Sequence, residues 1–103
     1  MKFLNILISL WNLLINFPIK PWNWGYISVN SSITMKNVND FPDKPWNWHA
    51  LSINPNVNID FVLEHKDKPF IYQLLTRHPN ITIENIENNI DLKWDFKYLS
   101  EIL

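Results

Sequence analysis

A regular internal repeat constrains this chain more than any other feature of its sequence. The numbers of Trp22 and Trp46 differ by 46 − 22 = 24, and the same step leads to Phe70 and Trp94. Three further columns keep this spacing without a gap: Trp24, Trp48, Tyr72 and Phe96; Ile27, Leu51, Leu75 and Leu99; and Ser28, Ser52, Thr76 and Ser100. Self-similarity at a fixed period of this size is typical of solenoids and other arrays. The chain is therefore predicted to be a series of short structural units.

The composition allows one folded domain and excludes several classes of function. The 103 residues are 47% hydrophobic, and the formal net charge is −1. A chain so close to neutral has no global field that attracts nucleic acid or an anionic membrane, so both are disfavoured as partners. Cysteine is absent, which removes disulfides and thiolate metal sites and suits a reducing compartment, so we expect a cytoplasmic protein. The single glycine, Gly25, excludes glycine-rich phosphate loops.

Residues 1–17 are apolar enough to resemble a secretory signal. Their polar side chains are Asn5, Ser9, Asn12 and Asn16. Spacings of four, three and four place these side chains on one stripe of a helix. No small-residue cleavage site follows, and residues 16–24 instead match residues 40–48. We predict an N-terminal apolar helix that closes a leading partial unit. The alternative is a membrane-associated or secreted repeat protein with residues 1–17 as a targeting segment.

The period divides a single repeat domain, residues 1–103, into successive units. The units are a leading partial unit at 1–19, full units at 20–43, 44–67 and 68–91, and a truncated final unit at 92–103. Each full unit is predicted to hold two short helices. The expected fold is all-α, a short right-handed-type helical solenoid. Isolated helices of this length are marginal in water, so neighbouring units must stabilise one another by stacking.

The first helix of a unit is predicted to begin at its Lys-Pro pair, because proline is well tolerated in the first turn of a helix. In the second full unit the helix would start at Pro45, with Asp43 near its positive end. Trp46 and Ala50 would then lie four residues apart on one helical face. We expect this helix to bury its aromatic side chains.

The second helix of a unit has a recognisable start. Thr82 is the predicted N-cap, with Ile81 packed on Ile86 as a hydrophobic staple. Thr34 and Asn58 occupy the same column in the two preceding units. One capping arrangement is therefore expected three times.

Within the last of these helices the apolar residues follow helical spacing. Ile83, Ile86 and Ile90 lie at i, i+3 and i+7 and are predicted to face the core. Glu84 and Glu87 are interpreted as solvated residues that interact with the helix dipole, and not as catalytic carboxylates.

A strand-based leucine-rich repeat is the competing fold, because Leu51, Ile53 and Asn56 partly match that pattern. The match fails in the neighbouring columns. Arg77 replaces Ile53 in the next unit, and Asn58 stands where the pattern needs an apolar residue. Helices are therefore favoured over strands.

The repeat pattern can be written Lys-Pro-Trp-Asn-Trp-x-x-Leu-Ser-x-Asn-Pro-Asn-Ile-Thr-x-Glu-x-Ile, assembled from residues 44–56 and 80–86. This pattern resembles the tryptophan-rich tandem repeats of predicted proteins from giant DNA viruses and related large genomes. The resemblance covers residues 16–103. It implies a viral repeat protein and implies no activity, because no function is established for that family.

No constellation of residues points to catalysis or to a cofactor. The histidines are His49, His65 and His78. They show no metal-binding spacing and are interpreted as surface or loop residues. No nucleophile motif is present, so we expect a non-enzymatic protein without cofactors. Binding of single-stranded nucleic acid through the aromatic columns is a third possible function.

One column varies while its neighbours stay nearly constant. Its members are Gly25, His49, Gln73 and Lys97. Repeat proteins commonly vary exposed positions on a fixed scaffold to recognise a partner, so this column is the candidate contact site. Random drift of surface residues is the plainer interpretation. The leading hypothesis is a scaffold for protein–protein contacts, bound to an unknown protein or to a second copy through the open C-terminal end of the array.

Overall fold

The computed structural model describes residues 11–17 and 20–103, which form short helices joined by tight loops. Residues 11–16 are helical. The helices that follow are α2 (Trp24–Val29), α3 (Met35–Asp40), α4 (Trp48–Leu51), α5 (Ile59–Glu64), α6 (Tyr72–Thr76), α7 (Ile83–Glu87) and α8 (Phe96–Ile102). These described segments contain no strand, so the all-α prediction is confirmed for them. Residues 1–10, which belong to the predicted N-terminal apolar helix, lie outside the described residues.

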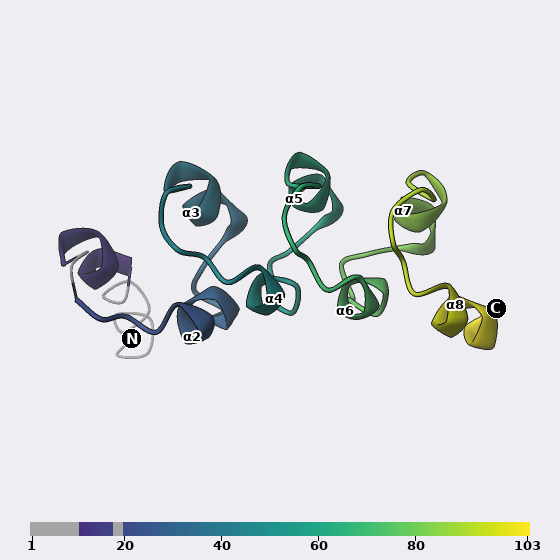
Figure 1. The fold of residues 1–103 in the computed structure, drawn as a ribbon, viewed down its shortest axis with the longest axis horizontal. Coiled ribbons are helices and arrows are strands. Elements are labelled where there is room, and N and C mark those ends of the chain that lie inside the picture. Colours follow the sequence, from purple (N-terminus) through teal and green to yellow (C-terminus); the bar gives the residue numbers. More distant parts are fainter. Residues whose placement is uncertain (1–10, 18–19) are drawn as a thin grey trace.

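Successive helices alternate between two rows. Figure 1 shows α2, α4, α6 and α8 along one side of the molecule and α3, α5 and α7 along the other. We call these the first row and the second row, after the order of the helices within a unit. First-row helices begin at Trp24, Trp48, Tyr72 and Phe96. The backbone therefore keeps the period of the sequence.

First-row helices begin later than predicted. In α4 the N-cap is Asn47, whose Oδ1 accepts a hydrogen bond from the Ala50 N–H at 3.0 Å. Pro45 precedes this cap and is not helical, because the Trp46 N–H bonds to the Lys44 carbonyl at 2.8 Å, which forms a three-residue turn around the proline. The predicted start at Pro45 is wrong, and Trp46 enters the core from the loop.

The N-cap predictions for the second row are confirmed. Thr34, Asn58 and Thr82 each accept a hydrogen bond from the backbone N–H three residues later. In α3 and α7 an asparagine at N3 also accepts from the N–H of the cap residue, so a full capping box forms there. Ile81 and Ile86 are both buried, as a hydrophobic staple requires.

The predicted apolar face of α7 is only partly buried. Because α7 ends at Glu87, Ile90 lies beyond the helix and is 59% exposed. Ile83 is 42% exposed, and only Ile86 belongs to the core. The helical spacing that linked Ile86 to Ile90 does not apply, since the chain turns toward α8 before reaching Ile90.

Aromatic pairs connect each unit to the next. The ring that opens each first-row helix meets, edge-on, the ring that the following unit contributes from the Trp22 column, a favoured aromatic geometry. The pairs are Trp24–Trp46, Trp48–Phe70 and Tyr72–Trp94, with centroid distances of 5.1, 5.4 and 5.5 Å and interplanar angles of 85°, 86° and 85°. Leu51 and Leu75 are fully buried beside them. The repeated apolar columns therefore form one core along the molecule.

The serine column forms hydrogen bonds between units, a role that the sequence alone did not reveal. Its hydroxyl oxygens accept from the N–H of the residue that caps the next first-row helix. The bonds are Asn47 N–H to Ser28 Oγ at 2.9 Å, Ile71 N–H to Ser52 Oγ at 2.9 Å and Asp95 N–H to Thr76 Oγ1 at 3.0 Å. Each hydroxyl therefore satisfies a backbone donor of the following unit.

Replacing Ser52 with alanine is expected to lower the free energy of unfolding by about 1–2 kcal/mol, because the Ile71 N–H loses its acceptor in a buried position. Ser52 is fully buried. Ser52→Thr is the matched control, since Thr76 makes the same bond in the next unit. Urea unfolding monitored by circular dichroism measures both changes. Equal losses for the two variants would contradict this role of the hydroxyl.

Candidate functional site

The candidate contact column lies at the second residue of each first-row helix. Its exposed members are His49, Gln73 and Lys97. Gly25 is only partly exposed, and a Cβ at this position would lie 3.3 Å from Asn23 Oδ1 and 3.6 Å from Asn47 Nδ2. The structure therefore places three members of the column at the surface and Gly25 against the caps of α2 and α4.

An apolar groove lies beside this column, between α2 and α4. Tyr26 and Ile53, which are 75% and 49% exposed, line it together with Val29 and Ala50. Its volume is about 260 Å³. Sequence reasoning missed this groove. The available signal was that Tyr26 and Ile53 are large apolar residues in columns that do not stay apolar, since Arg77 follows Ile53.

The first-row surface becomes charged beyond this groove. The Arg77 guanidinium lies 3.4 Å from the Asp95 carboxylate and 4.3 Å from the centre of the Tyr98 ring. Lys97 is exposed on the neighbouring helix. The row therefore presents an apolar half at α2 and α4 and a half with charged groups at α6 and α8.

His78 is a structural residue, which corrects its interpretation as a surface or loop histidine. It is 7% exposed, its Nδ1 accepts from the Asn80 N–H at 3.0 Å, and its Nε2 lies 2.9 Å from the Asn54 carbonyl oxygen. An acceptor at Nδ1 requires the neutral tautomer with its hydrogen on Nε2. His65 packs on Phe61, with ring centroids 4.5 Å apart.

The titratable side chains of the described residues have structural surroundings. No group of three His, Asp or Glu side chains within residues 11–17 and 20–103 is placed to hold a metal ion. Desolvation by burial raises the pKa of the Tyr72 phenol above its ordinary value. Its ring lies between Phe70 and Trp94, at 6.4 and 5.5 Å, so packing explains this shift.

The surroundings of the aromatic columns bear on the alternative functions. Trp46, Phe70 and Trp94 are buried, so their faces are not open for stacking on bases. Within the part of the chain that the structure describes, no helix combines the length and the apolar character needed to cross a bilayer. Most of the possible targeting segment, residues 1–10, lies outside that part.

Comparisons with known proteins leave the surface itself as the basis for a functional argument. No family model matches the chain, and no curated protein or solved structure shows significant similarity to it. The resemblance to giant-virus repeats rests on the sequence pattern.

Proposed function

We propose that this chain is a non-enzymatic helical solenoid that binds a protein partner along the exposed side of its first-row helices. The observation that carries this proposal is the contrast between the columns. The constant columns are buried or hydrogen-bonded between units, as Leu51 and Ser52 are. The columns of His49 and Tyr26 change from unit to unit at the surface. Solenoids commonly recognise partners through variable positions on such a scaffold.

The surface indicates the chemistry of the partner. The groove beside Tyr26 and Ile53 suits an apolar side chain, and exposed tyrosines often anchor protein interfaces. Farther along the row, Arg77 and Lys97 are exposed cations. A protein segment with an apolar anchor followed by acidic residues would complement both halves.

Affinity capture from the native host with the tagged chain tests this proposal. Two double variants, Tyr26→Ser/Ile53→Ser and His49→Ala/Gln73→Ala, are expected to lose a protein that the unmodified chain recovers. All four side chains are at least partly exposed, so the fold should be unaffected.

The matched control for this experiment is Lys36→Gln/Glu84→Gln, which changes exposed residues of the second row and conserves net charge. It is expected to retain the captured protein. Circular dichroism spectra should be the same for all variants. If the captured proteins are the same for every variant, the first row does not bind the partner.

The expected location is the cytoplasm, or the host cytoplasm for a viral protein. The absence of cysteine supports this location. N-terminal sequencing of the protein from each cell fraction separates it from the alternative. A chain that retains Met1 in the cytosol supports the proposal, whereas membrane recovery or removal of residues 1–17 supports a targeting segment.

A further inference from the structure

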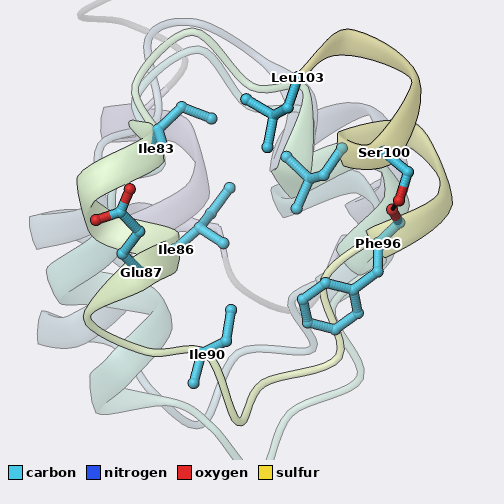
Figure 2. Close-up of a pocket in the computed structure, with 8 residues that line it drawn as sticks. Ile83, Ile86, Glu87, Ile90, Phe96, Ser100 and Leu103 are labelled. Carbon is cyan, nitrogen blue, oxygen red and sulfur yellow. Dashed lines mark hydrogen bonds between the residues drawn. The ribbon is translucent and has the colours of Figure 1, made fainter.

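An apolar groove lies at the end of the molecule formed by α7 and α8. It has a volume of about 260 Å³. Figure 2 shows Ile86, Ile90 and Phe96 pointing into the space between the two helices. Phe96 is 46% exposed and Leu103 is 85% exposed. This end therefore presents to solvent several side chains whose counterparts in earlier units belong to the core.

The aromatic pairs inside the chain show what fills such a groove. Trp24, Trp48 and Tyr72 each meet, edge-on, a ring that the following unit contributes. Phe96 belongs to their column, yet the described residues give it no aromatic partner. Trp22 belongs to the partner column and likewise has no aromatic pair among them. It is also the one member of its column that is only half-buried.

Hydrogen-bonding groups at the two ends are complementary. At each unit–unit interface a hydroxyl of the earlier unit accepts from the cap N–H of the later unit. Ser100 Oγ is the equivalent acceptor at the α8 end, where it is exposed. The equivalent donor is the Asn23 N–H, for which the described residues supply no acceptor. The column that makes this bond thus has an unused acceptor at one end and an unused donor at the other.

We propose that two copies of the chain associate head to tail. Trp22 of one copy enters the α7–α8 groove of the other, edge-on to Phe96, and the Asn23 N–H donates to Ser100 Oγ. The helix at residues 11–16 has the register of a second-row helix, whereas α8 belongs to the first row. The contact therefore continues the alternation of rows and repeats the internal interface. Because the two surfaces differ, the association is heterologous and can extend beyond two copies.

An internal ion pair supplies a sharp test. Arg77 and Asp95 approach within 3.4 Å across one unit–unit interface. At the proposed interface their columns bring Glu101 of one copy to Asn23 of the other. Asn23→Asp keeps an N-cap residue, as Asp95 does for α8, but sets two carboxylates opposite each other. Adding Glu101→Arg recreates the internal pair.

Sedimentation of the full chain over a range of concentrations measures the association. The average mass of the unmodified chain should rise with concentration, and Ile90→Glu should abolish the rise by placing a charge in the groove. Asn23→Asp should weaken association by roughly two- to five-fold at low salt, and Asn23→Asp/Glu101→Arg should restore or exceed the original affinity.

Three results would overturn the proposal: a monomer up to millimolar concentration, association that survives Ile90→Glu, or association that Ile90→Glu abolishes but Asn23→Asp leaves unchanged. The last result would indicate contact between two α8 ends. Circular dichroism checks that each variant is folded, and the Asn23→Asp/Glu101→Arg pair decides the case if Ile90→Glu is not. The inference does not depend on the proposed partner surface, so His49→Ala/Gln73→Ala should associate like the unmodified chain.

Discussion

Replacing Trp94 with alanine is expected to lower the free energy of unfolding by about 3–5 kcal/mol, because a large cavity opens between the last two units. Trp94 is 3% exposed, and its ring meets Tyr72 edge-on at 5.5 Å. Its Nε1–H also donates to the Asn89 carbonyl oxygen at 2.8 Å. Urea unfolding measures the change.

The matched control for this substitution is Trp94→Phe, since Phe70 occupies the same column and is buried without an indole N–H. We expect this variant to lose about 1–2 kcal/mol, for the hydrogen bond and part of the contact area. If Trp94→Phe were as damaging as Trp94→Ala, the hydrogen bond and not the packing would dominate at this position.

Replacing Asn54 with alanine is expected to cost about 2–4 kcal/mol, because several buried polar groups lose their partner at once. Asn54 is fully buried. Its Nδ2 donates to the carbonyl oxygens of Ser28 at 2.8 Å and Asn30 at 3.2 Å, and its Oδ1 accepts from the Asn56 N–H at 2.8 Å. Thermal and urea unfolding should both show the loss.

His78 provides the control for the Asn54 prediction, because it occupies the same column and bonds in the same way. Nδ1 of the imidazole replaces the asparagine Oδ1, and Nε2 replaces Nδ2. His78→Asn is therefore expected to cost less than about 1 kcal/mol, whereas His78→Ala should cost at least about 2 kcal/mol. Equal losses for these two variants would show that the hydrogen bonds of this column contribute little.

The accuracy of the sequence predictions depends on whether local signals compete. Thr82 is predicted correctly as an N-cap, because its hydroxyl and the N–H that it accepts lie within one turn of the chain. The predicted first-row start is wrong because Pro45 and Asn47 both offer a helix beginning. Ser28 favours Asn47 by accepting its N–H. That contact joins two units, so no local rule includes it.

The candidate site is only partly predictable for the same reason. Variation in one column identifies His49 and Gln73 as exposed residues from the sequence alone. The groove between α2 and α4 depends on Tyr26 and Ile53 lying side by side, which requires the packed arrangement of two units. The prediction for His78 is wrong because its imidazole substitutes for an asparagine side chain, a similarity of shape that residue type conceals.

The direction of the hydrogen bonds between units has a consequence for biosynthesis. The carbonyl and hydroxyl oxygens that accept belong to the earlier unit, as in the bonds from Asn54 to Ser28 and from His78 to Asn54. During translation the N-terminal part of a chain emerges first. Each newly exported segment therefore meets a finished template, and the nascent polypeptide can grow as an ordered structure from the ribosome outward without waiting for its last residues.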